Sequence, residues 1–345
     1  MKGRVVALDH LGGRRAAALI QDGRLDDFLI DPGPDAAPSP GSVFRAICDR
    51  PLKGQGGMMV RLPHSTGFLR HGRGLRPGES LLVQVTGYSE AGKAVPVTDR
   101  LLFKSRYVIV TPGAPGLNVS RAIRDEDARV RLLEIAADCA GNDPTVGLII
   151  RSAAQHGAAE DIAADIVAML ELSTSVLAKP EPPPALLLAG PDAHALARRE
   201  WPEPDVLAQA SSAFSDHGVH EMVAALASPR LDLPNGAFAF VEPTRALVAV
   251  DVNTGADTSP AAALKATIAL ARSLPRHLRC RGLGGQITID FAPLAKKDRR
   301  QVEQVLKSAF AHDPIETALP GWTPLGHFEL QRKRERLPVV VDWLE

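Results

Sequence analysis

The chain has 345 residues, of which 45% are hydrophobic and only 4% are aromatic, and its 40 basic residues balance its 40 acidic ones. This balance excludes binding to nucleic acid through overall positive charge, so a polyanion would have to meet a local basic patch. The three cysteines are isolated, which excludes a disulfide framework and a cysteine zinc site. Because no apolar run is long enough for a membrane span and no signal-peptide pattern follows Met1, we expect a soluble, cytoplasmic protein without a membrane partner.

Residues 2–100 have the pattern of short β-strands. We expect three strands joined by glycine-containing turns, at residues 4–8, 16–20 and 25–30. The proline-rich residues 31–41 form a connector. Five strands then follow at regular intervals and favour a small barrel of the OB-fold type, at residues 43–47, 57–62, 66–69, 80–85 and 94–98. Phe68 in this barrel is suited to stack on one base, and the alternative is a core side chain.

A strand that ends in an arginine and a serine stands out in the next region. Strands are expected at 104–110 and 146–150, and helices at 125–137 and 160–178. Arg151 and Ser152 directly follow the second strand, and a guanidinium with a hydroxyl can hold a phosphate. A structural salt bridge of Arg151 is the alternative. The proline-rich residues 179–184 end the second helix and mark a boundary.

The most informative stretch runs from residue 246 to residue 291. Its two ends are apolar, β-branched runs that indicate buried strands, and each closes on an aspartate, Asp251 and Asp290. Residues 260–281 between them suit a crossover helix, so the two strands should be parallel. Two carboxylates at neighbouring strand ends can share one divalent cation. The alternative is a pair of capping or turn aspartates.

Shorter elements flank this stretch. Strands are expected at 185–188, 205–208 and 238–242, and helices at 193–200, 217–227 and 296–312. The chain closes with a compact basic cluster at residues 331–334.

The order of these motifs resembles the bacterial ribonuclease E/G family along most of the chain. The most specific part is residues 233–255, which end in Val-Asp-Val-Asn-Thr-Gly, followed by residues 283–291, which end in Ile-Thr-Ile-Asp-Phe. Residues 299–303, Gly326 and residues 329–334 continue the series in the family's order. The agreement of several ordered motifs is a strong signal of this family.

The resemblance implies a multidomain architecture of α/β and α+β type. An RNase H-like region, split in sequence, would comprise residues 1–41 and 185–230. An OB-fold RNA-binding domain at residues 42–100 and a 5′-sensor region at residues 101–184 would be inserted in it. A DNase I-like catalytic domain would follow at residues 231–345.

The resemblance also implies the residues of a metal site. Asp251 and Asp290 match the two aspartates that bind a magnesium ion in this family, and Asn253 matches the asparagine that supports them. Mg²⁺ is a hard ion that accepts one or two carboxylates together with water and phosphate oxygens. We therefore expect Mg²⁺ as the cofactor, with Mn²⁺ as a substitute.

RNA-binding positions follow from the same resemblance. Arg151 and Ser152 match the arginine and threonine that hold a 5′-monophosphate, and serine keeps the hydroxyl. Arg121 matches another arginine of the sensor region. Phe68 and Lys93 match RNA-contacting positions of the barrel.

Two departures from the family pattern affect assembly and RNA capture. The cysteine motif that links family members through zinc is absent, so we expect no zinc, and any homo-oligomer would not be zinc-linked. Pro324 stands where the family has an arginine, which weakens the expected 5′ sensor.

The sequence therefore predicts an Mg²⁺-dependent endoribonuclease that cleaves single-stranded RNA in processing or decay, leaving 5′-phosphate and 3′-hydroxyl ends. The alternative is a non-catalytic RNA-binding relative that attaches to ribosomes or to a degradation complex. The intact set of Asp251, Asn253 and Asp290 favours the enzyme, because a binding module has no need for a metal site.

Overall fold

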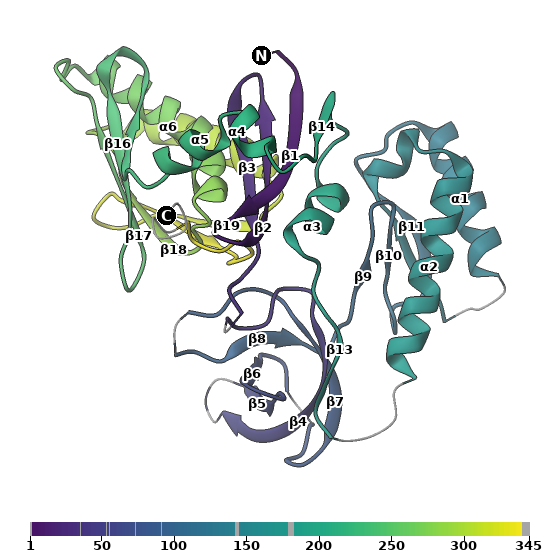
Figure 1. The fold of residues 1–345 in the computed structure, drawn as a ribbon. Helices are drawn as coiled ribbons and strands as arrows, with labels where there is room; N and C mark the ends of the chain where they lie inside the picture. Colours follow the sequence, from purple (N-terminus) through teal and green to yellow (C-terminus); the bar gives the residue numbers. More distant parts are fainter. Residues whose placement is uncertain are drawn as a thin grey trace. The chain divides into compact units, whose positions relative to one another are not determined.

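The computed structural model describes residues 2–34, 36–52, 54, 56–72, 74–90, 92–141, 145–178 and 183–339. Most of the expected proline-rich boundary, residues 179–182, and the end of the expected catalytic domain, residues 340–345, lie outside the described residues. The chain divides into two compact units. Unit 1 comprises residues 1–33 and 204–345, and unit 2 comprises residues 34–203 (Figure 1). In the described part, no helix is long and apolar enough to cross a membrane.

The first sheet of unit 1 joins the N-terminus to a segment distant in sequence. Its order is β14-β1-β2-β3, from β1 (Arg4–Leu11), β2 (Arg14–Gln21), β3 (Arg24–Ile30) and β14 (Val206–Ala208), which confirms the three expected N-terminal strands. β14 pairs with β1 in parallel. The β2–β3 turn places Asp22 and Gly23 at positive φ, 52° and 78°, as a tight hairpin turn of this length requires. Two short helices, α4 (Ala213–Asp216) and α5 (Val219–Ala225), bury Phe214 and Val219 in the same core.

The second sheet of unit 1 carries the two aspartates. Its order is β15-β16-β17-β18-β20-β19, from β15 (Arg230–Asp232), β16 (Phe238–Pro243), β17 (Val248–Asn253), β18 (Gly285–Asp290), β19 (Thr317–Trp322) and β20 (Phe328–Arg332). The expected parallel pairing of β17 with β18 is confirmed. β19 was not expected from the sequence. This strand contains Pro320 and Gly321, and both residue types are unfavourable inside a strand.

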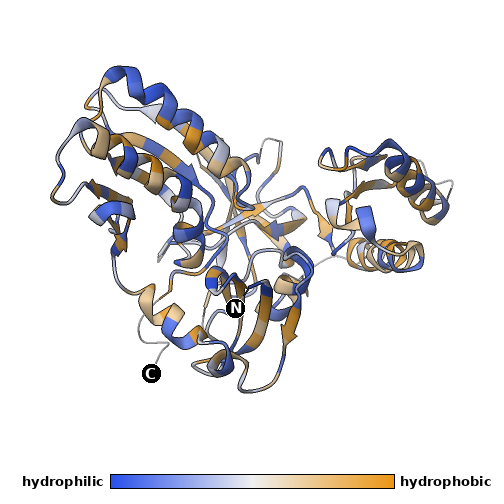
Figure 2. Cartoon of the chain, turned by 90° about the horizontal axis from the view of Figure 1, so that it is seen from above, coloured by the Kyte–Doolittle hydropathy of each residue, from blue (hydrophilic) through white to orange (hydrophobic). Residues whose placement is uncertain are grey.

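Two helices belong to the second sheet and bury one of its faces. They are α6 (Pro260–Cys280) and α7 (Arg299–Ala311), with the short turns η2 (Pro234–Gly236) and η3 (Lys296–Asp298) nearby. α6 begins where Ser259 accepts a hydrogen bond from the amide of Ala262, with Pro260 in the first turn. Leu270 and Leu274 of α6 lie in one core with Val250 and Ile289 of the strands. Hydrophobic residues predominate along the strands, whereas the helices also carry hydrophilic residues (Figure 2).

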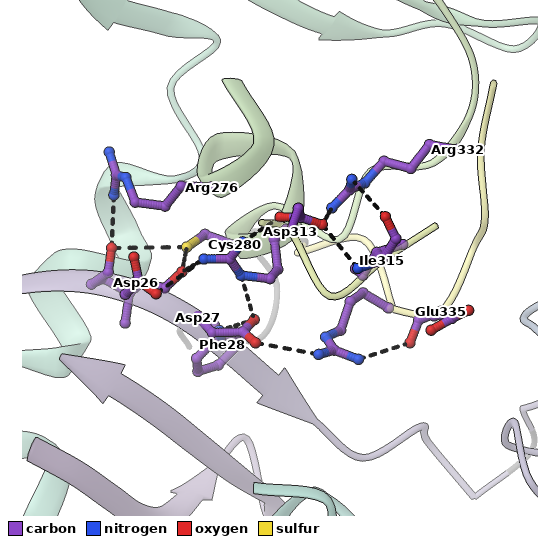
Figure 3. A network of polar contacts seen from close by, with 12 residues as sticks. Asp26, Asp27, Phe28, Arg276, Cys280, Asp313, Ile315, Arg332 and Glu335 are labelled. Atoms are coloured by element: carbon purple, nitrogen blue, oxygen red, sulfur yellow. Dashed lines mark hydrogen bonds and ion pairs between the residues drawn. The ribbon is translucent and has the colours of Figure 1, made fainter. Parts of the chain in front are cut away.

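A buried ionic network connects the two sheets of unit 1 (Figure 3). The guanidinium of Arg279, at the end of α6, contacts Asp26 at 3.1 Å and Asp27 at 3.6 Å on β3, and also Asp313 beyond α7. Arg332 on β20 donates to the same Asp313 at 2.8 Å, and both side chains are fully buried. Although burial lowers the pKa of Arg279, the three aspartates raise it overall, so this guanidinium stays charged. The network ties the N-terminal sheet to the sheet that carries the aspartates.

Unit 2 contains a closed five-stranded barrel. The strands are β4 (Val43–Leu52), β5 (Gly57–Arg61), β6 (Thr66–Leu69), β7 (Ser80–Val85) and β8 (Val95–Thr98), at the expected positions. They pair in the order β4-β5-β6-β8-β7, and β7 returns to β4. β13 (Ala185–Leu188) adds to β4 as a further strand. A closed barrel of five strands is the arrangement of an OB-fold.

The rest of unit 2 is a small mixed sheet with helices. Its elements are β9 (Phe103–Lys104), β10 (Val108–Val110), β11 (Gly116–Val119), α1 (Glu126–Ala140), β12 (Gly147–Ile150), η1 (Ser152–His156), α2 (Ala159–Leu177) and α3 (Ala193–Glu200). The single strand expected at 104–110 is wrong, because a turn at Ser105 divides it into β9 and β10. The Ser105 hydroxyl donates to the carbonyl of Val108 at 3.2 Å. β11, which was not expected from the sequence, pairs in parallel with β12.

Candidate active site

β17 and β18 are neighbouring strands (Figure 1), and their parallel pairing makes Asp251 and Asp290 register partners. The two residues are direct register partners, with Asp290 at the end of β18 and Asp251 two residues before the end of β17. Their backbones are therefore about 4.8 Å apart, and their side chains share one face. The residues before them, Val250 and Ile289, are buried against the helices. The alternation of the strands therefore places both carboxylates on the opposite, open face. The Asp290 side chain is 67% exposed.

Asn253 belongs to the same cluster. It lies two residues after Asp251 on β17, and its Nδ2 donates a hydrogen bond to Oδ2 of Asp251 at 2.7 Å. This bond fixes the orientation of the Asp251 carboxylate and leaves its other oxygen open to a ligand. In the part of the chain that the structure describes, neither aspartate caps a helix, and α6 begins with Ser259 instead. The helix-capping part of the alternative is therefore excluded, while metal binding stays a prediction.

The donor set fits a hard divalent cation. Two exposed carboxylates in neighbouring register offer oxygen ligands, and Mg²⁺ typically takes one or two carboxylates with water and phosphate filling the remaining positions. Within the described residues, no group of three or more His, Cys, Asp or Glu side chains is arranged to hold a metal. An ion held at this pair would therefore rely on water and substrate for the rest of its ligands.

His327 is a neighbour of the carboxylates that the sequence did not predict. Its Nε2 lies 3.8 Å from Oδ1 of Asp290, because β20 pairs antiparallel with β18 and Phe328 is opposite Ile289. Its position in the sequence gives no indication of this contact, which follows only from the pairing of β18 with β20. At this distance, a protonated imidazole can pair with the carboxylate or with a phosphate.

Arg299 adds positive charge near the same loop. A Cβ built on Gly326 would lie 3.2 Å from Nη2 of Arg299, so the guanidinium lies against the segment that precedes His327. The guanidinium carbon also lies 4.6 Å from the centre of the Trp322 ring. This stacking holds Arg299 at the start of α7. Arg299 therefore lies beside the turn between β19 and β20, next to the segment that leads to His327.

The residues expected to sense a 5′-phosphate lie at one edge of the small sheet in unit 2. β11 and β12 run parallel, and the amide of Ser120 donates to the carbonyl of Ile150 at 2.8 Å. Arg121 and the Arg151–Ser152 pair therefore follow neighbouring strand ends. Arg121 and Ser152 are exposed. The topology therefore brings these segments together.

The Arg151 guanidinium, however, is engaged inside unit 2. Its Nη2 pairs with Glu200 on α3 at 2.6 Å, its Nη1 donates to the carbonyl of Ser105, and its side chain is only 16% exposed. Lys104 and Arg199 contact the same carboxylate at 2.9 and 2.8 Å. Burial would raise the pKa of Glu200, but these three cations lower it to about 2. The salt-bridge alternative for Arg151 is thus present, and the sensing role stays a prediction.

The two expected RNA-contacting residues of the barrel lie on neighbouring segments. Phe68 on β6 is partly exposed and is opposite Met59 on β5, and its ring covers Gly57, where a Cβ would clash with it. Lys93 precedes β8, which runs parallel to β6, and it is 68% exposed with Glu90 at 2.5 Å. Lys93 is therefore accessible to a polyanion, while its charge is partly screened by Glu90.

Comparisons with known proteins agree with the motifs. The model of the ribonuclease E/G family matches residues 103–207 and 200–335. Ribonuclease G of Salmonella typhimurium (strain SL1344) is 28% identical over 305 aligned positions, which cover 76% of this chain and 61% of the relative. Ribonuclease G of Escherichia coli (strain K12) is 29% identical over 304 positions, with the same coverage. Ribonuclease E of Nostoc sp. (strain PCC 7120) is 28% identical over 304 positions, with 44% of that relative covered. The chain thus spans less than two thirds of the length of these relatives.

Proposed function

The chain belongs to the ribonuclease E/G family, and from this premise we propose that it is an Mg²⁺-dependent endoribonuclease acting on single-stranded RNA. The observation that carries the proposal is the register pair of Asp251 and Asp290 on an open sheet face. Relatives named ribonuclease G and ribonuclease E support a role in RNA processing or decay.

Each residue of the site has a distinct role in this proposal. Asp251 and Asp290 would hold the Mg²⁺, and Asn253 keeps the Asp251 carboxylate oriented. When bound, Mg²⁺ supplies positive charge that polarises the phosphate and makes water a stronger nucleophile at neutral pH. Attack of water on phosphorus breaks the bond to the 3′-oxygen. The products then carry a 5′-phosphate and a 3′-hydroxyl, and the ribose 2′-hydroxyl does not act as nucleophile.

RNA capture is assigned to unit 2. The barrel, with partly exposed Phe68 and exposed Lys93, would contact single-stranded RNA. A 5′-monophosphate that reaches Arg151 would have to compete with the Glu200 carboxylate for the guanidinium. We therefore propose that 5′ sensing by Arg121, Arg151 and Ser152 is weaker here than a free arginine would allow.

Family membership also supports the proposed division into RNase H-like, OB-fold, sensor and DNase I-like parts. In this division, residues 1–41 with β1 to β3 and residues 185–230 form the RNase H-like part, and residues 231–345, with β16 to β20, α6 and α7, form the DNase I-like part. β13 and α3 fall in unit 2 with the barrel and the sensor.

The test is an incubation of the purified chain with a 5′-monophosphorylated, single-stranded RNA, with Mg²⁺ or with EDTA, beside Asp251→Asn. We expect cleavage that requires Mg²⁺ and is lost in the variant, with 5′-phosphates on the downstream fragments. RNA retention without cleavage in any metal would contradict the enzyme and favour the alternative of a non-catalytic RNA-binding relative.

A further inference from the structure

Two phenylalanines lie on the open sheet face directly beside the metal-site residues. In the antiparallel pairing of β16 with β17, Phe240 is opposite Asp251 and Phe238 is opposite Asn253. Residues directly opposite on antiparallel strands point to the same face, with Cβ atoms about 4.5–5.5 Å apart. Ala239 alternates with them and is buried on the other face. The two rings therefore continue the row of carboxylates towards the β15 edge of the sheet.

These rings contribute nothing to a hydrophobic core. Neither belongs to any of the four core clusters formed by the described residues, and both are partly exposed. They contact each other edge to face, with centroids 5.7 Å apart and planes at 84°. Aromatics make up only 4% of this chain, so two neighbouring phenylalanines on an open face require an explanation other than folding.

An arginine is stacked on the same pair. The guanidinium carbon of Arg230 on β15 lies 4.0 Å from the centre of the Phe238 ring. Its Nε donates to Asp232 at 3.0 Å, which fixes the plane of the guanidinium. In the described part of the chain, its two Nη groups make no hydrogen bond, so they can donate to a phosphate.

We propose that Arg230, Phe238 and Phe240 form an aromatic platform on which one nucleobase of the RNA stacks while the neighbouring phosphate lies at Asp251 and Asp290. The inference rests on the proposed function, because the carboxylates define where the phosphate lies. An aromatic face accepts any base, and an adjacent arginine holds the backbone, which is how sequence-tolerant single-strand binding works. An apolar protein segment is a poorer occupant, because the row continues from the rings into carboxylates and the stacked group is a cation.

The first test removes the ring and the base separately. Phe240→Leu keeps an apolar side chain in the strand but removes the π face, and Phe240→Tyr is the matched control that retains it. RNAs with an abasic ribose at successive positions around the cleavage site remove the base. We expect Phe240→Leu to lower kcat/KM about tenfold or more. An abasic ribose at one position beside the cleavage site should lower kcat/KM of the parent by a similar factor. Phe240→Leu acting on that abasic RNA should show no larger loss than either change alone, because both remove the same stacking contact. Phe240→Tyr should behave like the parent.

The proposed platform would be contradicted if the two losses in kcat/KM multiplied, or if neither change lowered kcat/KM. Either result would leave the proposed endoribonuclease activity unaffected. The abasic series on the parent protein needs no variant, so it remains decisive if Phe240→Leu does not fold.

A second measurement does not depend on cleavage. RNAs carrying the fluorescent base 2-aminopurine at successive positions are bound in EDTA, where stacking on an aromatic ring quenches emission. We expect quenching at one position in the parent and in Phe240→Tyr, and loss of quenching in Phe240→Leu. If the parent fails to cleave RNA, the proposed function falls, and this quenching alone decides the platform. Bound RNA without quenching at any position would overturn it.

Discussion

The carboxylate pair in unit 1 and Arg151 in unit 2 were both predicted to bind ligands, but their surroundings differ in exposure and charge. Asp251 and Asp290 are exposed, carry like charge in direct register and have no basic residue in contact except His327 at 3.8 Å, counting only the described residues. Arg151 is 16% exposed and is paired with Glu200 at 2.6 Å. An exposed charge without an ion-pair partner inside the protein is available to bind a ligand. A buried charge in an ion pair mainly stabilises the fold, and a ligand must displace its partner.

The like charges of the carboxylate pair carry a cost. Like charges directly opposite each other destabilise a sheet, and a divalent cation removes the repulsion. The Arg151 cluster has the reverse arrangement, since three cations share one carboxylate and need no ligand to hold them. The comparison therefore predicts that variants of the aspartates change activity and variants of the arginine cluster change stability.

The largest expected effect is on catalysis, in Asp290→Asn. Loss of one metal ligand removes several kcal/mol of transition-state stabilisation, so cleavage should fall by about a thousandfold or more. RNA binding should persist, and the unfolding free energy should stay the same or rise slightly. Single-turnover cleavage, RNA retention and urea unfolding measure the three quantities. Glu316→Gln is the control and should cleave normally, because Glu316 pairs with Lys333 at the end of β20 opposite to His327. Equal cleavage by Asp290→Asn and the parent would remove Asp290 from the site.

The second effect is on the stability of unit 1, in Asp313→Ala. This change leaves Arg279 and Arg332 buried without their shared partner, and breaking a buried pair costs about 3–5 kcal/mol. Urea unfolding followed by circular dichroism measures it. Glu316→Gln removes an exposed partner of Lys333 and should cost less than about 1 kcal/mol. A similar, small loss in both variants would show that the buried network does not hold the two sheets together.

The third effect is a pH dependence that belongs to unit 2. Because the pKa of Glu200 is lowered from 4.5 to about 2 in the folded state, its ionised form contributes stability above pH 4.5 that is lost as the pH falls towards 2. The difference corresponds to about 3 kcal/mol. Thermal unfolding of the parent should therefore shift to lower temperature as the pH falls through this window. Glu200→Gln should unfold at lower temperature near pH 7 and lose part of this slope. An unchanged slope would mean that another group governs the acid transition.

The smallest effect concerns the 5′ end. Since Arg151 must leave Glu200 to bind a phosphate, the parent should prefer 5′-monophosphorylated over 5′-hydroxyl RNA only several-fold, and Arg151→Gln should remove that preference. Glu200→Gln frees the guanidinium and should enlarge the preference. Competition between the two RNAs in one cleavage reaction measures the ratio. A strong preference in the parent that survives Arg151→Gln would place the sensor elsewhere.

Local pattern and motif order were enough to predict most elements and the carboxylate pair. The strand, helix, strand arrangement around Asp251 and Asp290 follows from residues close in sequence, so the parallel direction of the two strands could be predicted. The division of residues 104–110 into two strands could not be predicted from the sequence, because it depends on a turn that the Ser105 hydroxyl stabilises.

Partners distant in sequence explain the other misses. Arg332 belongs to the basic cluster at residues 331–334, and its full burial against Asp313 could not be read from that cluster. Glu200 is far along the chain from Arg151, and His327 reaches Asp290 only through the pairing of β18 with β20. A sequence shows which groups carry charge, but the tertiary fold decides which of them are neutralised.

The most direct test of the account is a count of bound Mn²⁺ by electron paramagnetic resonance, which requires no cleavage. The parent, Asp251→Asn and Asp290→Asn are titrated with Mn²⁺, and Mg²⁺ is then added as competitor. We expect one Mn²⁺ per chain in the parent, which Mg²⁺ displaces and which either variant loses. Retention of the same bound Mn²⁺ in both variants would contradict a metal site at the carboxylate pair.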